Sequence, residues 1–314
     1  MKIPFLVSIL FMFSEVFSEI EYKEEFPVLR TNAGDIFGTL YVPEPYKRLP
    51  VAILVAGSGP TDRNGNQPKL KNNSLKMLAE ALGSNGIASL RYDKRAIGQS
   101  KIKNLVEEDL RFEHYIEDAK AWSNLLKDKN QFNQIIMVGH SEGSLIGIIA
   151  SQTGIVDKFI SLAGPGKSAD KLLKEQLSKK PMVSYFASQI IDDLVQRKQV
   201  EAPFFLKPLF RDSVQPYLIS WFNYDPSIEI SKLTIPSLII QGTNDIQVTV
   251  EDAELLSSSN EISKLIIIQG MNHILKNTKL DEGENIKSYN NPTLPLNEEL
   301  VKKIVEFIKY NPIN

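Results

Sequence analysis

The chain of 314 residues contains no cysteine, which excludes disulfide bonds, a thiolate nucleophile and cysteine-ligated zinc or iron–sulfur sites. It also lacks an excess of basic residues, because 36 Lys and Arg stand against 38 Asp and Glu. A formal charge of −2 provides no basic field that would attract nucleic acid or an anionic membrane. The sequence has no metal-ligand cluster at a usable spacing, so we expect no metal, no organic cofactor and no nucleic-acid partner.

The apolar run at the N-terminus, residues 3–13, is too short to span a bilayer comfortably. It follows Lys2 and precedes a polar end at residues 14–18, a pattern typical of a secretory signal peptide. We therefore expect residues 1–18 to be removed and the mature protein to be periplasmic or secreted, without stable membrane insertion. Glu15 and Phe17 are unusual so close to a cleavage point. The alternative is an uncleaved hydrophobic segment docked on the domain of a cytoplasmic protein.

Short apolar runs alternate with amphipathic segments along most of the chain, which predicts an α/β protein with a doubly wound, mostly parallel sheet. Runs rich in Val, Ile and Leu are typical of strands buried on both faces of such a sheet. A hairpin is predicted near the N-terminus, at residues 26–31 and 35–42. Buried strands are expected at residues 51–55, 87–92, 134–138, 158–162, 236–240 and 264–268. Helices are expected at residues 74–82, 109–126, 144–150 and 298–310.

One segment, residues 167–232, interrupts this alternation and contains no buried strand. Helices are predicted there at residues 172–177, 182–195 and 203–221. An insertion of this size predicts a helical cap over the carboxyl ends of the strands, on a core of residues 19–166 and 233–314. The alternative is a helical decoration without a gating role. Its aromatic residues either line a substrate pocket or form ordinary core: Tyr185, Phe186, Phe204, Phe205, Trp221 and Phe222.

A G-x-S-x-G motif occupies residues 139–143, between a predicted buried strand and a predicted helix. This context is typical of a nucleophile elbow, in which a sharp turn exposes a serine hydroxyl above the sheet. Glycines two positions before and after the serine prevent side-chain clashes at the turn. We therefore expect Ser141 to be a catalytic nucleophile. The alternative is a structural Gly-Ser turn.

A serine hydroxyl needs a base within hydrogen-bond reach, and the chain contains only three histidines. His114 lies in a predicted helix, and His140 should point away from its neighbour Ser141. His273 follows the last predicted strand, so position and elimination favour it as the base. In the chain order serine, acid, histidine, Asp245 follows the preceding strand and is expected to orient His273. Two acids nearby, Glu251 and Asp252, are more typical of the first turn of a helix.

Stabilisation of a negatively charged oxygen requires two backbone amides. One is expected from Glu142, the residue after the nucleophile, and one from the small-residue loop 57–60. Within that loop Ser58 is the first choice and Gly59 the alternative. Polar residues 61–66 are expected to hold this loop by hydrogen bonds, and the alternative is that they contact the substrate. The charged segment 91–95 is expected to brace loops around the site.

These motifs resemble those of bacterial α/β-hydrolases of the esterase and serine-aminopeptidase group, closest to thermophilic-type carboxylesterases with a helical cap. The resemblance extends from about residue 30 to the end and includes residues 57–66, 211–218, 241–245 and 272–273. It implies the α/β-hydrolase fold and a triad of Ser141, Asp245 and His273. It further implies a carboxylesterase that forms an acyl-enzyme on a small-molecule ester.

Several alternatives to the carboxylesterase remain open at this point. An aminopeptidase or other amidase would require an acidic pocket for a peptide amine, for which Asp192 and Asp193 are the candidates. A thioesterase would use the same triad. A non-catalytic binding protein on this scaffold is disfavoured by the presence of all three triad residues.

Overall fold

The computed structural model describes residues 21–44, 48–129 and 131–310. The expected signal peptide therefore lies outside the described residues. A nine-stranded sheet runs through the molecule in the order β1-β3-β5-β4-β6-β7-β8-β9, with β2 paired to β3. The strands are β1 (Tyr22–Glu25), β2 (Val28–Arg30), β3 (Asp35–Pro43), β4 (Leu49–Val55), β5 (Ala88–Tyr92), β6 (Phe132–His140), β7 (Lys158–Leu162), β8 (Ser237–Gly242) and β9 (Ser263–Ile268).

The strands from β5 across to β9 are parallel, whereas β1, β2 and β3 pair antiparallel at one edge. Every residue of β5, β7 and β8 is buried. These strands are buried because helices cover both faces of a parallel sheet. The structure confirms the predicted doubly wound, mostly parallel sheet and the hairpin that begins it.

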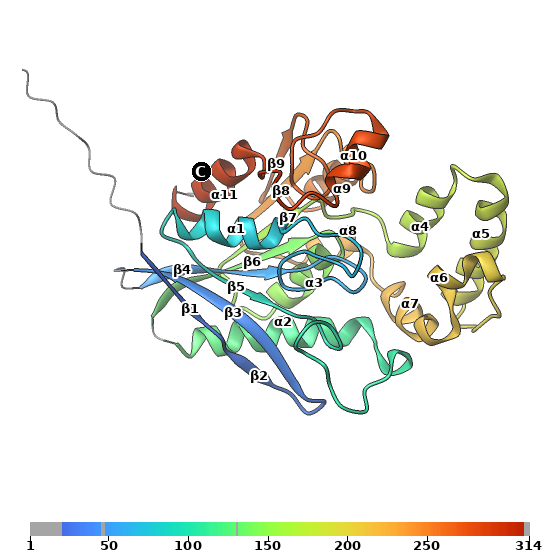
Figure 1. Cartoon of the computed structure of the whole chain (residues 1–314), viewed down its shortest axis with the longest axis horizontal. Helices are drawn as coiled ribbons and strands as arrows, with labels where there is room; N and C mark the ends of the chain where they lie inside the picture. The colour runs from blue at the N-terminus through green and yellow to red at the C-terminus, as the bar shows by residue number, and fades with distance from the viewer. Residues whose placement is uncertain (1–20, 45–47, 130, 311–314) are drawn as a thin grey trace, which may run out of the picture.

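Helices cover both faces of the sheet (Figure 1). One apolar cluster joins α1 and α11 to the sheet, and a second joins α2 and α3 to its other face. Because each parallel strand is followed by a helix that returns the chain, the carboxyl ends of all these strands lie at one edge. The helices of this core are α1 (Ser74–Gly83), α2 (Phe112–Lys127), α3 (Glu142–Ser151), α9 (Val250–Ser258), α10 (Glu282–Ser288) and α11 (Glu298–Tyr310).

Five helices lie between β7 and β8 in the chain, and α4 to α7 form a lobe beyond the sheet (Figure 1). They are α4 (Ala169–Leu177), α5 (Pro181–Val195), α6 (Lys207–Phe210), α7 (Gln215–Trp221) and α8 (Pro226–Ile230). The single helix predicted at residues 203–221 is wrong. Pro208 and Pro216 lack an amide hydrogen and therefore start new helices, α6 and α7, instead of continuing one.

The short elements β1, α8 and α10 were not predicted. Strand β1 has the sequence YKEE and is largely exposed, so it carries no apolar pattern. Helix α10 has only seven residues and a polar sequence. Within the described part of the chain, no helix combines the length and the apolar character that crossing a bilayer requires.

Candidate active site

Ser141 stands at the turn between β6 and α3 with φ 55° and ψ −125°. This region of backbone space costs about 1–3 kcal/mol for a residue with a side chain. Two neighbouring glycines allow the turn, because a Cβ atom on Gly139 would lie 2.2 Å from the Gly143 carbonyl oxygen. A Cβ atom on Gly143 would lie 2.3 Å from the Val55 carbonyl oxygen. The G-x-S-x-G spacing is therefore required by the packing of the turn.

Asp245 and His273 are joined by a hydrogen bond of 2.8 Å between the carboxylate Oδ2 and the ring Nδ1. Asp245 follows β8 and His273 follows β9, so neighbouring parallel strands bring the two side chains together. An ionised carboxylate can only accept a hydrogen bond, so Nδ1 carries the proton. The other ring nitrogen, Nε2, is then an unprotonated acceptor in the neutral imidazole.

The Asp245 carboxylate is fully buried but well supplied with donors. The amides of Gln247 and Val248 donate to Oδ1 over 2.8 and 3.0 Å, and Gln241 Nε2 donates to Oδ2 over 3.0 Å. Burial alone would raise the pKa of Asp245, but His273 and these donors outweigh it and hold the pKa below its usual value. The carboxylate therefore stays ionised at neutral pH.

His140 and His114 occupy different environments from His273. The ring of His140 packs 5.0 Å from the His273 ring, and its Nε2 contacts the His273 carbonyl oxygen. Burial, and then repulsion from His273, lower the pKa of His140 to about 4. The ring of His140 thus lies against His273, whereas we expected it to point away into neighbouring packing. His114 accepts a hydrogen bond from the Arg111 amide at the start of α2, over 3.2 Å.

Ser141, His273 and Ser58 line one cavity of about 250 Å³. Polar side chains that sequence reasoning missed lie on its walls: Gln67, Asn72, Gln247 and Tyr289. Gln67 and Asn72 follow the predicted polar loop and could have been suspected from that position. Tyr289 follows α10 and carried no signal, because only the fold brings this segment to the site.

The loop that begins at Gly57 packs directly against the nucleophile turn. A Cβ atom on Gly57 would lie 3.0 Å from the Ser141 Cβ atom, so glycine allows this approach. Ser58 lines the cavity that contains Ser141, whereas Gly59 lines only the neighbouring larger cavity. This placement favours the Ser58 amide over the Gly59 amide. The amide of Glu142 lies at the N-terminal end of α3, directly after Ser141.

Hydrogen bonds hold the polar residues that follow this loop. Asp62 Oδ1 accepts from the amides of Asn64 and Asn66 over 2.8 and 2.9 Å. Arg63 forms an ion pair of 2.7 Å with Asp93. Nearby, Arg95 binds both carboxylate oxygens of Asp118, each over 2.7 Å. The residues from 61–66 and 91–95 are therefore tied into one network beside the site.

A larger cavity, of about 550 Å³, lies between this network and helices α4, α6 and α7. Ser58 lines both cavities, so they meet at the loop of residues 57–60. The wall is mainly apolar: Leu110, Tyr115, Leu173, Leu209, Phe210, Val214, Tyr217, Leu218 and Trp221. Of the aromatic residues singled out in the insertion, Trp221 lines the cavity. Tyr185, Phe186, Phe204 and Phe205 are exposed instead.

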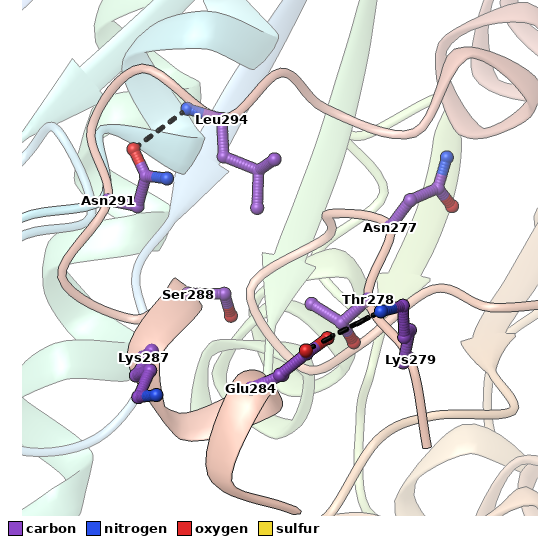
Figure 2. Close-up of a pocket in the computed structure, with 8 residues that line it drawn as sticks. All are labelled: Asn277, Thr278, Lys279, Glu284, Lys287, Ser288, Asn291 and Leu294. Carbon is purple, nitrogen blue, oxygen red and sulfur yellow. Dashed lines mark hydrogen bonds and ion pairs between the residues drawn. The ribbon is translucent and has the colours of Figure 1, made fainter. Parts of the chain in front are cut away.

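A third cavity, of about 520 Å³, is formed by the segment after His273 and by α10 (Figure 2). Its lining includes Ser288 and an ion pair of 3.4 Å between Lys279 and Glu284. Ser288 Oγ accepts a hydrogen bond of 2.8 Å from Asn272, the residue before His273. None of the predicted site residues lines this cavity. Among the described residues there is also no group of three or more His, Asp or Glu side chains that could hold a metal ion.

The mostly parallel sheet, the strained serine between strand and helix, and the Asp245–His273 pair define an α/β-hydrolase. The sequence profile described as "Serine aminopeptidase, S33" matches residues 72–235, just over half of the chain. The chain belongs to this family, and the resemblance noted in its sequence is confirmed.

Proteins similar to this chain include esterases. The chain is 27% identical over 246 residues to Esterase EstD of Thermotoga maritima. That match covers 76% of this chain and 57% of the relative, so this chain spans little more than half of the relative's length. Among solved structures, Est1E from Butyrivibrio proteoclasticus with ferulic acid bound is similar, with a TM-score of 0.60 and 19% identity over 88% of this chain and 97% of that one. The Pyrococcus furiosus esterase Pf2001 has a TM-score of 0.58 and 20% identity over 92% and 91%. These two structures support the fold.

Proposed function

We propose that this protein is a serine hydrolase that cleaves carboxylic esters through an acyl-enzyme, with Ser141, Asp245 and His273 as its triad. The observation that carries this proposal is the 2.8 Å bond between His273 Nδ1 and Asp245, on the wall of the cavity that contains Ser141. This bond fixes the imidazole so that Nε2 is free to accept a proton. The esterase name of the Thermotoga relative supports the same activity.

In the first half of the reaction, Ser141 Oγ attacks the ester carbonyl carbon while His273 Nε2 takes its proton. The carbonyl oxygen becomes an oxyanion, which the amides of Ser58 and Glu142 stabilise. His273 then gives the proton to the departing alkoxide, and the C–O bond of the ester breaks. In the second half, water attacks the acyl-enzyme, His273 takes the proton of the water, and Ser141 leaves with that proton as the acid is released.

We assign the alcohol part of the ester to one cavity and its acyl part to the other. His273 must reach the leaving oxygen to protonate it, so the alcohol occupies the 250 Å³ cavity that His273 lines. Gln67, Asn72 and Gln247 on that wall suit a polar alcohol. The acyl group then extends past Ser58 into the apolar cavity of 550 Å³ beneath α6 and α7. The substrate class we propose is a polar alcohol esterified with a bulky apolar acid.

An aminopeptidase activity is less well supported, although the family description contains that word. A peptide amine needs an unpaired carboxylate, and the acids on the wall of the large cavity are paired: Glu107 with Arg211, and Glu142 with Lys94. Asp192 and Asp193, the acids considered for this role, lie on α5 with 61% and 42% of their side chains exposed. They line neither cavity.

A fluorophosphonate probe tests the nucleophile, because it labels activated serines. We expect labelling of the wild type and none of Ser141→Ala. Comparison of p-nitrophenyl esters with p-nitroanilides of amino acids then tests the bond type, and we expect the esters to have the higher kcat/KM. An unlabelled wild type, or equal labelling of Ser141→Ala, would contradict the proposal.

We also propose that the protein is exported, on the basis of the charged start, apolar run and polar end of residues 1–18. N-terminal sequencing of the protein from cell fractions tests this. We expect a mature chain that begins at Glu19 in the periplasmic or culture fraction. An intact Met1 in that fraction would contradict cleavage.

A further inference from the structure

Lys94 is a buried lysine whose ammonium group lies behind the oxyanion loop. Its Nζ donates a hydrogen bond of 2.6 Å to the Gly57 carbonyl oxygen and lies 3.5 Å from Oε1 of Glu142. The Lys94 and Glu142 side chains are only 3% and 2% exposed. Burial lowers the pKa of Lys94, and the Glu142 carboxylate opposes this shift. Burial of an ion pair costs free energy unless further hydrogen bonds satisfy its polar groups.

The contact with Gly57 acts on the proposed oxyanion donor. The carbonyl group of Gly57 and the N–H of Ser58 belong to one planar peptide group, and in the trans form they point in opposite directions. A hydrogen bond that fixes the oxygen therefore fixes the direction of the N–H. A cation at the oxygen also polarises the peptide group and strengthens the N–H as a donor. Lys94 thus acts on the Ser58 amide from the side away from the substrate carbonyl.

The second contact of Lys94 reaches the other half of the oxyanion hole. Glu142 supplies the second proposed amide, and its side chain is the partner of Lys94. We propose that Lys94 is a positioning residue that holds the Gly57–Ser58 peptide in register with the Glu142 amide. This inference rests on the proposed function. Because displacement of a catalytic group by about 1 Å can cost about 100-fold in rate, such a tether has a measurable effect on catalysis.

A second buried lysine provides a matched control at a distance from the site. Lys158, at the start of β7, donates to the carbonyl oxygens of Phe307 and Ile308 over 2.9 and 2.8 Å. It is 6% exposed and lines neither of the two substrate cavities. A purely structural role of a buried lysine should therefore give Lys94→Met and Lys158→Met the same kinetic result.

The first test measures kcat and KM for a p-nitrophenyl ester, together with the affinity for an alkyl trifluoromethyl ketone that forms a tetrahedral adduct. For Lys94→Met we expect kcat to fall about 10- to 100-fold with KM changed less than about threefold. Ketone affinity should fall by the same factor as kcat/KM. Lys158→Met should retain wild-type kcat per folded molecule. A Lys94→Met variant with kcat within threefold of the wild type would overturn the inference.

Chemical rescue provides a second test that depends on the N–H donors of the ammonium group. Lys94 lines the 550 Å³ cavity, so a small amine can reach the space left in Lys94→Ala. Ethylammonium should restore part of kcat, whereas tetramethylammonium, which has no N–H, should not. Equal effects of the two ions would contradict the tether. If the wild type itself is neither labelled by a fluorophosphonate nor active on esters, the proposed function fails. If the wild type is active and the Lys94 variant has the same kcat, only the role of Lys94 as a tether is refuted.

Discussion

His140 Nε2 donates a hydrogen bond of 2.7 Å to the backbone carbonyl oxygen of His273, across 133 residues of sequence. A carbonyl oxygen can only accept, so His140 Nε2 carries the proton and the tautomer is fixed. His140, the residue before Ser141, thereby anchors the loop that bears His273. The elbow and the His273 loop are connected directly, although they come from β6 and β9, which are not neighbours in the sheet.

The first prediction concerns the pH dependence of stability. The pKa of His140 is about 4 in the folded chain, against 6.5 for the free side chain, so the unfolded chain binds the extra proton between these values. The stabilisation of the folded chain by neutral, buried His140 is fully present above pH 6.5 and is lost as the pH falls towards 4. By linkage the loss is about 3 kcal/mol.

Urea unfolding of the wild type and His140→Gln from pH 7 to pH 4 measures this contribution. Glutamine keeps an N–H donor for the His273 carbonyl but does not titrate. The wild type should lose about 3 kcal/mol relative to the variant over this range. A constant difference between the two proteins would show that His140 does not titrate in this way.

The second prediction concerns the carboxylate that orients the base. Asp245→Asn should lower kcat by about 10³- to 10⁴-fold, since an amide nitrogen facing His273 favours the wrong tautomer. Oδ1 accepts from the backbone amide of Val248, and Oδ2 accepts from Gln241 Nε2, which a second hydrogen bond to the Val248 carbonyl oxygen holds in place. Either orientation of asparagine places N–H against N–H, so we also expect a loss of about 1–3 kcal/mol in stability.

Asp252→Asn is the matched control for this substitution. Asp252 is fully buried and accepts a hydrogen bond from the Gly166 amide over 3.0 Å. Its hydrogen bonds stabilise the start of α9 and the loop after β7, and none involves His273. Its replacement should lower the free energy of unfolding while kcat per folded molecule stays near the wild-type value. Steady-state kinetics and urea unfolding check both variants. Comparable losses of kcat in the two variants would contradict a specific role of Asp245 in orienting His273.

The third prediction concerns the packing that keeps the elbow tight. Gly143→Ala places a Cβ atom 2.3 Å from the Val55 carbonyl oxygen and 2.7 Å from that of Ala56. Both neighbours are backbone atoms and cannot swing away, so we expect a loss of at least about 2 kcal/mol in the free energy of unfolding. Gly154→Ala is the control, because nothing lies within 4 Å of its Cβ position although its φ is +75°. It should cost about 1 kcal/mol. Thermal unfolding of both variants measures the difference.

The parts of this fold that the sequence predicts are those with a local physical signature. Residues 51–55 (VAILV) form a continuous apolar run because both faces of their strand are covered, and they lie in the buried strand β4. The insertion is harder to predict because helical periodicity at residues 203–221 competes with Pro208 and Pro216, and the prolines prevail. Strand β1 is held by backbone pairing with β3, which any side chain permits, so its sequence YKEE shows no alternation of apolar and polar residues.

The residues of the candidate site also fall into those with a local sequence signal and those without one. Ser141 has a motif of its own, and His273 could be singled out because the chain contains only three histidines. The contact between Lys94 and Gly57 spans 37 residues and joins a side chain to a backbone oxygen, so no spacing or residue type reveals it. Tyr289 reaches the cavity only through the packing of α10. The chemistry is thus encoded locally, whereas the walls of the site depend on tertiary structure.

The last prediction concerns the length of the acyl group. Val214 lies just before α7 and lines the 550 Å³ cavity, so Val214→Phe reduces the space that we assign to the acid. We expect an acetyl group to be too short to reach this wall, whereas a long acyl chain must displace the new ring or stay partly in water, at about 0.8 kcal/mol per methylene group. We expect kcat/KM for p-nitrophenyl acetate to stay within about threefold, while that for the decanoate falls at least about tenfold.

Val195→Phe makes the same substitution at a position of α5 that is 48% exposed and lines neither substrate cavity. It should leave the acetate-to-decanoate ratio unchanged. A parallel fall for both esters together with a loss of stability in Val214→Phe would indicate general damage to the site. A parallel fall with unchanged stability would place the acyl group in the 250 Å³ cavity instead, because the p-nitrophenol that both esters share would then occupy the apolar cavity beside Val214.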